Sequence, residues 1–211
     1  MTRPPRASPD RILAAAALEF AERGFAGARV DRIARRARVN KAMLYYHFRS
    51  KQELYRTLLR GVFTHVAERF QAIARASGAA PDKIDRVVST FADFICEHEF
   101  FPAIMLREVA EGGAHLDRKT LRALVSVPRA FFSILQQGAA EGALRPVNPL
   151  VAYFSATAPI VFYLAAGPIR REVTARHLMN LSALSPDDFV HQLQDALRRA
   201  FAQGASARPH R

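Results

Sequence analysis

The segment from Val30 to Phe48, VDRIARRARVNKAMLYYHF, constrains the fold more than any other part of the sequence. In its first half, apolar residues follow the spacing i, i+3, i+4, i+7, which is typical of a short helix that packs on another element. These residues are Val30, Ile33, Ala34 and Ala37. Arg38 and Val39 interrupt the pattern, so we expect the first helix to end there in a tight turn.

A second short helix is expected to begin after Asn40, a favoured N-cap because its side-chain oxygen accepts from the free N–H groups of the next helix's first turn. Within this helix Leu44 and Phe48 lie four residues apart and, with Val39, point inward. The remaining surface carries small, aromatic and basic residues, namely Lys41, Ala42, Met43, Tyr45, Tyr46 and His47. A helix with one apolar, inward face and one exposed face of small, aromatic and basic residues suits the major groove of DNA.

These two helices and their surroundings resemble the DNA-binding domain of the TetR family of transcriptional regulators. The resemblance covers about the first quarter of the chain and rests on Ile12–Phe20, Gly24–Phe25, Val30, Ile33–Ala34, Val39–Lys41, Leu44–Phe48 and Ser50–Leu54. The rest of the chain is similar to the family only in length, helical character and short phrases such as Leu106–Glu108. The resemblance implies a homodimeric regulator that binds a double-stranded DNA operator and responds to a small-molecule effector.

By this resemblance, the first turn of the second helix contacts bases. Lys41 would donate to guanine N7 and O6, whereas Ala42 and Met43 would meet thymine methyl groups or fill space. The family often has Gly and Thr at the last two positions, so the operator sequence does not follow from the resemblance. Four further residues map onto positions that often contact phosphates, namely Tyr45, Tyr46, His47 and Lys51. Tyr45 is equally compatible with a ring in the domain core, and His47 with an ordinary surface position.

Two arginines depart from the family pattern. Arg29 stands where Ser or Thr usually caps the first of the two helices, and losing that cap costs about 0.5–2 kcal/mol. Arg38 replaces a common Gly in the turn, where a left-handed conformation would cost about 1–2 kcal/mol. We expect Arg29 to approach a DNA phosphate and both arginines to steepen the salt dependence of DNA binding.

The distribution of charge agrees with a nucleic-acid partner. The chain has 31 Lys and Arg against 19 Asp and Glu, a formal net charge of +12. Residues 1–60 hold 14 of the basic and 5 of the acidic residues. The positive charge is therefore concentrated around the expected DNA-binding helices, as expected for a protein that binds a polyanion.

Helical periodicity between Gly and Pro residues predicts an all-α fold. We expect a basic arm at residues 1–7, a helix–turn–helix domain at 8–50, a helical effector-binding and dimerisation domain at 51–204, and a tail at 205–211. The first helix should follow Ser8 and stop at Gly24. A capping box of Ser50 and Glu53 should open a long helix from residue 51 to about 76, and later helices are expected near 82–97, 101–111, 117–141, 149–166 and 186–203.

The larger domain is rich in aromatic rings, which by default indicate core packing. With the resemblance, they also indicate an apolar effector pocket between helices. Candidate pocket residues are Phe94, His98, Phe101, Met105, Arg107, Phe131, Phe132, Phe154, Thr157 and Phe162. For Arg107, an ion pair at the surface or between subunits competes with a role in binding an anionic effector.

The last two expected helices are candidates for the dimer interface. Small residues on one and an apolar stripe on the other let helices of two copies approach closely, although the same stripe could close the subunit's own core. The candidate residues are Ala152, Ala156, Phe189, Leu193, Leu197 and Ala200. A dimer would read a palindrome with half-sites about 34–36 Å apart.

Several classes of function are not supported by any motif. The sequence lacks a Gly-rich phosphate loop, an HExxH motif and a nucleophile motif, so we expect no enzyme, no metal site and no cofactor. No apolar stretch approaches the length of a membrane span, and the N-terminus does not resemble a signal peptide. The single cysteine, Cys96, suits a reducing cytoplasm and is expected to be a small core residue.

The expected function is that of a cytoplasmic, dimeric transcriptional repressor released from a palindromic operator by a small, largely apolar effector. The effector would favour a state in which the long helix is tilted and the DNA-reading helices leave the groove spacing. Two alternatives remain open: an architectural protein that binds DNA without sequence specificity, and a small-molecule-binding module without a DNA function. The effector, the operator, the regulated genes and the sign of regulation do not follow from the sequence.

Overall fold

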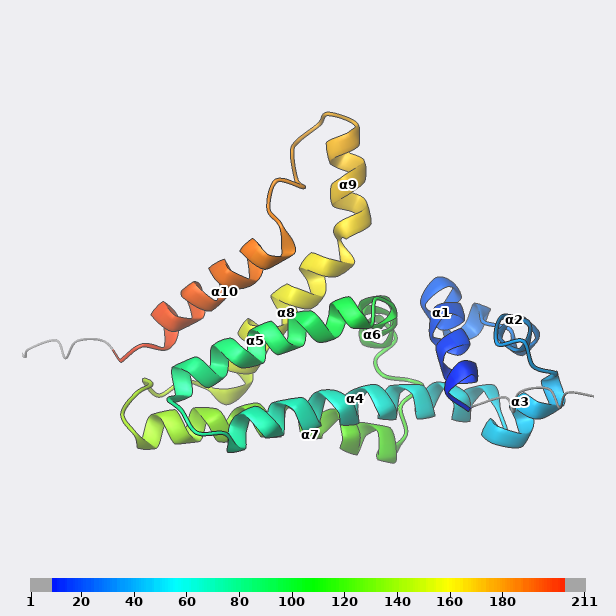
Figure 1. Ribbon diagram of the computed structural model, residues 1–211, viewed down its shortest axis with the longest axis horizontal. Coiled ribbons are helices and arrows are strands. Elements are labelled where there is room, and N and C mark those ends of the chain that lie inside the picture. Colours follow the sequence, from blue (N-terminus) through cyan, green and yellow to red (C-terminus); the bar gives the residue numbers. More distant parts are fainter. Residues whose placement is uncertain (1–8, 204–211) are drawn as a thin grey trace, which may run out of the picture. The chain divides into compact units, whose positions relative to one another are not determined.

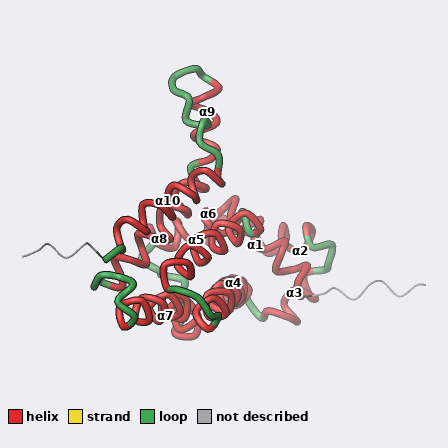
Figure 2. The backbone as a smooth tube through the Cα atoms, turned by 60° about the vertical axis from the view of Figure 1, so that its left-hand side comes forward, coloured by secondary structure: helices red, strands yellow, loops and turns green. Residues whose placement is uncertain are grey.

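The structure is a computed structural model that describes residues 9–203, and within that range it consists of ten α helices (Figure 1). Figure 2 shows helices and loops over the same residues, and an isolated bridge joins Leu144 to Ala202. The all-α prediction is confirmed. The expected N-terminal arm, the Ser8 cap and the C-terminal tail lie outside the described residues.

The chain forms two compact units. The first comprises the N-terminal part up to Phe63 together with His98–Leu124, and the second comprises Thr64–Glu97 and the part from Val125 onward. This division differs from the boundary expected at residue 50, because the long helix α4 contributes to both units and a later helix joins the N-terminal ones.

The first unit begins with α1 (Pro9–Gly27), α2 (Val30–Arg36) and α3 (Lys41–Phe48). The apolar face of α1, including Ile12, Ala16 and Phe20, is buried. Its regular course ends at Gly24, whose φ of 68° is left-handed and is readily adopted by a residue without a Cβ. The predicted stop at Gly24 is thus confirmed, and the chain then makes a further turn before α2.

The long helix α4 spans Lys51–Arg75, close to its predicted bounds. An apolar stripe along α4 is buried at every position, namely Leu54, Leu58, Val62, Val66, Phe70 and Ile73. The capping box is half formed. The Ser50 Oγ atom accepts from the backbone N–H of Glu53 at 3.0 Å, but the Glu53 carboxylate accepts from Arg60 at 2.6 Å instead of returning to Ser50.

The first unit also contains α6 (Phe100–Ala110) and the start of α7 (Arg118–Ala140). Helix α6 packs on α1 and buries Phe101, Ile104 and Glu108. Asp117 caps α7 by accepting from the backbone N–H of Thr120 at 2.8 Å, and this bond and the Thr120 hydroxyl lower the pKa of Asp117.

The second unit is formed by the later part of α4, by α5 (Ala80–Glu97), and by most of α7 with α8 (Pro149–Ala165), α9 (Gly167–Ala175) and α10 (Pro186–Phe201). Helix α5 packs against both α8 and α10. Asn148 and Ser185 cap α8 and α10, each followed by a proline that suits the first turn. Helix α9 was not expected from the sequence, because Gly167 and Pro168 resemble a break.

None of the helices in residues 9–203 is by itself long and apolar enough to cross a membrane. Helices α8 and α9, bent by 48° at their junction, meet that test only when taken together, and only by length and composition.

Candidate nucleic-acid interface

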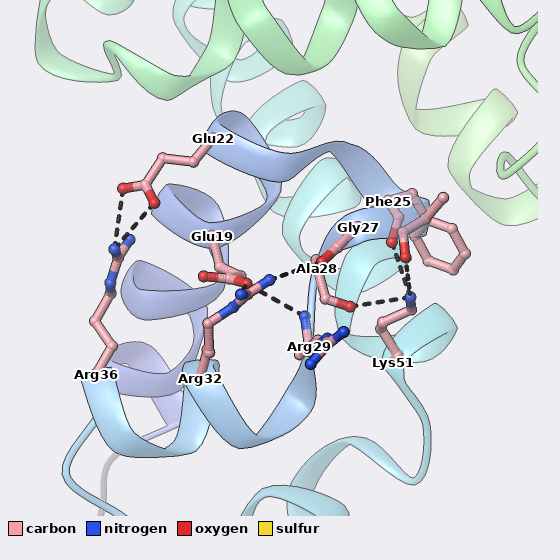
Figure 3. Close-up of polar contacts among 10 residues, drawn as sticks. Glu19, Glu22, Phe25, Gly27, Ala28, Arg29, Arg32, Arg36 and Lys51 are labelled. Atoms are coloured by element: carbon pink, nitrogen blue, oxygen red, sulfur yellow. Dashed lines mark hydrogen bonds and ion pairs between the residues drawn. The ribbon is translucent and has the colours of Figure 1, made fainter.

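The start of α2 is held by a buried carboxylate from α1. Arg29 is the N-cap of α2 and, as expected, makes no side-chain capping bond. Instead, Glu19, which is 2% exposed, accepts from the Arg29 backbone N–H at 3.2 Å and from Arg32 Nε at 2.6 Å (Figure 3). A negative charge at a helix N-terminus is favourable, so Glu19 replaces the missing cap.

The pKa of Glu19 is lowered from its usual range. Burial alone would raise it, but the hydrogen bonds from Arg32 and from the Arg29 backbone outweigh burial. A second, more exposed pair joins the same helices, since both carboxylate oxygens of Glu22 accept from Arg36, at 3.0 and 3.1 Å (Figure 3). Arg11 of α1 adds a bond to the carbonyl of Ala37, the C-cap of α2, at 3.0 Å. Three ionic or charge-assisted contacts therefore fix α2 on α1.

The carbonyl groups near the end of α1 are satisfied by two cations. The Lys51 ammonium donates to the carbonyls of Phe25 at 2.8 Å and Ala28 at 3.2 Å, and it lies 4.6 Å from the centre of the Phe25 ring (Figure 3). Arg107 of α6 donates to the carbonyls of Phe20 at 3.0 Å and Ala21 at 2.5 Å. Cations suit the negative end of a helix. Both side chains thus hold unit-one helices together.

The second short helix, α3, is anchored as its sequence predicts. The Asn40 side chain accepts from the backbone N–H of Met43 at 2.7 Å, which confirms the expected cap. Leu44 and Phe48 are buried, whereas Val39 is half-buried. With its back fixed in the core, α3 presents one defined face to solvent.

The exposed face of α3 carries most of the predicted DNA-contact residues. Lys41, Ala42, Met43, Tyr45 and Tyr46 are exposed, and Tyr46 is 81% exposed. The alternative position of Tyr45 inside the core is not observed. His47 is half-buried, with its ring edge-on to Tyr46 at 5.3 Å.

The ammonium of Lys41 already has an acidic partner. It lies 2.9 Å from the carboxylate of Asp31 on α2, and the hydrogen bond to Asp31 raises the pKa of Lys41. Both side chains are largely exposed, so the pair is open to competition from water, salt or a nucleic acid.

Arginines in left-handed backbone conformations stand at both ends of α3. Arg38, in the turn before it, has φ 53°, and Arg49, its C-cap, has φ 50°. The left-handed conformation whose cost was considered for Arg38 is therefore present. Because side chains with a Cβ rarely adopt this conformation, both positions store backbone strain.

The predicted effector-pocket residues are divided between the two units. His98, Phe101, Met105 and Arg107 belong to the first unit, and the other six belong to the second. Phe94, Phe131 and Thr157 are packed in the core, whereas Phe154 and Phe162 are 58% and 69% exposed on α8. The Arg107 guanidinium donates to the carbonyls of Phe20 and Ala21 on α1.

A cavity of about 260 Å³ lies between α5, α8 and α10 in the second unit. It is lined by Ser89, Ala92, Asp93, Cys96, Ile160, Tyr163, Leu164, Pro186, Asp187, Phe189, Val190 and His191. Tyr163 and Phe189 stack with ring centres 4.0 Å apart, so their pair forms an aromatic wall. Cys96 is exposed rather than a core residue, because it lies on the side of α5 that faces this cavity.

The predicted dimer residues also require correction. Ala152 and Ala156 are 0% exposed and pack in the subunit's own core, and Leu197 is buried as well. Phe189 and Leu193 are half-buried, and Ala200 is exposed. The exposed apolar side of α8 is instead formed by Leu150, Val151, Phe154, Ala158, Pro159 and Phe162. Phe154 and Phe162 thus change from pocket candidates to surface residues.

Two supporting residues were missed from the sequence. Glu19 occurs within an apolar stretch between Leu18 and Phe20, and this acidic residue among core positions was the available signal. Arg11 gave no signal, since its partner, the Ala37 carbonyl, is a backbone group 26 residues away.

Comparisons with known proteins agree with this geometry. Residues 12–58 match the family model for bacterial regulatory proteins of the tetR family, and residues 81–187 match a tetracyclin repressor-like C-terminal domain. The chain therefore belongs to the TetR family of regulatory proteins, whose members are transcriptional regulators rather than enzymes.

Individual relatives are similar over part of their length. The chain is 31% identical over 140 residues to the HTH-type transcriptional repressor NicS of Pseudomonas putida, covering 65% of this chain and 60% of that protein. It is 33% identical over 111 residues to the HTH-type transcriptional repressor SCO4008 of Streptomyces coelicolor, covering 53% and 54%. The chain thus matches little more than half the length of these relatives.

A solved structure extends the similarity of fold. A TetR family transcription regulator from Marinobacter aquaeolei superimposes with a TM-score of 0.71 at 17% identity, covering 93% of this chain and 96% of that one. At this identity the match establishes the fold alone.

Proposed function

We propose that this protein is a DNA-binding transcriptional regulator whose helix α3 enters the major groove. The observation that carries the proposal is the division of α3 into a buried side, Leu44 and Phe48, and an exposed side of small, aromatic and basic residues. Family membership and the repressor names of the similar proteins support the same role. Such a protein acts where the bacterial chromosome is, in the cytoplasm.

The exposed residues divide into two kinds of contact. Lys41 would leave Asp31 to donate to guanine, and Ala42 and Met43 would pack on thymine methyl groups. Tyr45, Tyr46 and His47, with Arg29 before α2 and Arg38 before α3, would contact phosphates and fix α3 in register. These contacts are supported by the positions of the residues on or next to α2 and α3 and by the exposure of their side chains to solvent.

Lys51 has a different role in this proposal. Its ammonium is shared among backbone carbonyls at the end of α1, so it would act mainly by positioning α4 beside the α1–α2 connection. A lysine bound in this way has fewer free donors for a phosphate than the freely exposed Tyr46.

The DNA proposal is tested by competition at a fixed salt concentration. Fragments selected from the host's genomic DNA should bind at least about a thousandfold more tightly than scrambled duplex of the same length. Tyr46→Ala should weaken binding to both, because a phosphate contact is independent of sequence. Met43→Ala should mainly reduce the preference for selected fragments over scrambled duplex. Equal affinity for selected and scrambled DNA would instead support an architectural DNA-binding protein.

We further propose that two copies associate through the exposed apolar side of α8. Leu150, Val151, Phe154 and Phe162 are each more than half exposed, and an apolar surface of this kind favours association. A twofold dimer would place two α3 helices on one face of DNA and read a palindrome. Sedimentation equilibrium should give a dimer, which Phe154→Glu converts to a monomer.

The cavity between α5, α8 and α10 is the proposed effector site. Its volume suits a small molecule, and its stacked Tyr163–Phe189 wall suits an apolar or aromatic one. Asp93 and Asp187 add carboxylates at its edge, so a neutral or cationic effector is favoured over an anionic one.

Effector binding would act as a release signal only if the effector prefers the form that does not bind DNA. A thermal-shift screen of small aromatic amines and carboxylates tests the charge preference. The amines should stabilise the protein, and Asp93→Asn should reduce the effect. Stabilisation by carboxylates alone would contradict the assignment.

A further inference from the structure

Three side chains of types that can ligate a metal ion meet at the end of α6, outside the predicted DNA-contact residues. Glu108 lies on α6, Glu111 is the residue that ends it, and His115 follows in the next turn. Gly112 and Gly113, with φ of 66° and 74°, turn the chain back between them. The candidate ligand atoms of the three residues all lie within 4.8 Å of one another.

The three side chains point toward a common place. His115 Nδ1 lies 2.8 Å from Glu108 Oε1 and 3.2 Å from Glu111 Oε2. In a tetrahedral zinc site with ligand distances of about 2.0–2.1 Å, neighbouring ligand atoms are about 3.4 Å apart. Against that spacing, the contact with Glu108 is about 0.6 Å short and the contact with Glu111 about 0.2 Å short, so side-chain shifts of that size would admit an ion.

Glu108 supplies independent evidence that a ligand belongs here. Its side chain is 2% exposed, and its buried Oε2 atom has no hydrogen-bond partner among residues 9–203. Buried carboxylate oxygens are normally satisfied, and a bound cation is one way to satisfy them. The other oxygen, Oε1, accepts from the Tyr55 hydroxyl at 2.8 Å, which holds the carboxylate in place.

Surrounding groups orient the imidazole of His115. Its ring lies 4.2 Å from the ring centre of Phe25 and 5.8 Å from that of Tyr55. Its backbone carbonyl accepts from Arg56 Nε at 2.9 Å. Outer contacts of this kind fix a ligand for a metal, while the 46% exposure of the Glu111 side chain leaves a path from solvent.

We propose that Glu108, Glu111 and His115 bind one divalent transition-metal ion, and that Zn²⁺ suits them best. One imidazole nitrogen and two carboxylate oxygens match the donors that Zn²⁺ takes in proteins, with water as a fourth ligand. Mg²⁺ prefers oxygen ligands and dehydrates reluctantly, so it should bind poorly. The two carboxylates also balance the charge of a divalent ion.

Isothermal titration of the full-length, tag-free protein with Zn²⁺ tests the site. We expect one ion per protomer at micromolar or tighter affinity, and Glu111→Gln should weaken binding at least about tenfold. The matched control is Glu68→Gln, which alters an exposed glutamate of α4 and should leave the affinity unchanged. His115→Ala should abolish the tight phase, and circular dichroism verifies that each variant is folded.

Co²⁺ provides a second measurement that does not depend on the heat of binding. Bound by these residues, it should develop the visible absorption of four- or five-coordinate cobalt, and Glu111→Gln should diminish the band. Absence of Zn²⁺ binding at millimolar concentration would overturn the proposal. So would equal affinities of the wild type and Glu111→Gln, because the chain's other histidines would then account for the binding.

Discussion

Replacing Glu19 with glutamine should destabilise the protein by about 1–2 kcal/mol at neutral pH. The side chain is 2% exposed and accepts from Arg32 Nε and the Arg29 backbone N–H. Hydrogen bonds to a charged group contribute about 1.5–3 kcal/mol, and those between neutral groups about 0.5–1.5 kcal/mol. Glutamine keeps an acceptor of the same size, so the expected loss of stability comes from the removed charge and not from altered packing.

The effect should depend on pH in a defined direction. Because the folded-state pKa of Glu19 is lowered, its contribution is present above the unfolded value, about 4.3, and is lost as the pH falls through the folded value. Urea denaturation at pH 7 should separate the wild type from Glu19→Gln, and the two should converge in acid. An undiminished difference in acid would refute the assignment to charge.

Glu22→Gln is the matched control for this experiment. Glu22 lies on the same helix and also pairs with an arginine of α2, Arg36, but its side chain is 49% exposed. Exposed pairs contribute little, so the expected cost is at most about 1 kcal/mol. If Glu22→Gln destabilises the protein as much as Glu19→Gln, burial is not what makes the Glu19 contact important.

Three other predictions concern DNA binding and assembly. Arg38→Gly should stabilise the fold by about 1–2 kcal/mol, since glycine tolerates the φ of 53° at this position. The same change should reduce the slope of the logarithm of the DNA-binding constant against the logarithm of salt concentration by about 0.9 if one phosphate contact is lost. An unchanged slope in filter-binding titrations would exclude that contact. Asp31→Asn should tighten DNA binding by freeing Lys41, and weaker binding would show that the pair instead orients Lys41 for DNA. Phe154→Glu should give a monomer that binds operator DNA poorly, whereas Ala152→Ser should affect folding more than association. A dimeric Phe154→Glu variant would contradict the proposed interface.

Local features of the DNA-binding helices could be predicted from the sequence. The cap at Asn40 and the inward Leu44 and Phe48 follow from spacing and from the preferences of neighbouring residues. Such features depend on a few consecutive residues, for which sequence patterns are informative.

Contacts between distant parts of the chain could not be predicted in this way. Arg107 donates to carbonyls 86 and 87 residues earlier, so α6 joins the N-terminal unit although no periodicity relates the two. The capping role of Glu19 likewise depends on the packing of α2 against α1.

Helix α8 shows a different limit of prediction from the sequence. It is apolar on nearly every side, so its periodicity does not distinguish the core from the surface. The sequence therefore placed Ala152 at an interface and Phe154 in a pocket, whereas the structure buries the alanine and exposes the ring. The cavity between α5, α8 and α10 was missed for another reason, because it is formed by three helices from separate parts of the chain.

The central claim is that two copies of α3 read DNA as a symmetric pair. Selection and sequencing of bound fragments from the host's genomic DNA, with the protein's stoichiometry measured on each recovered site, tests it most directly. The account predicts an inverted repeat with half-site centres about 34–36 Å apart and two protomers per site. Fragments with no shared inverted repeat, or a single protomer bound to each, would contradict it.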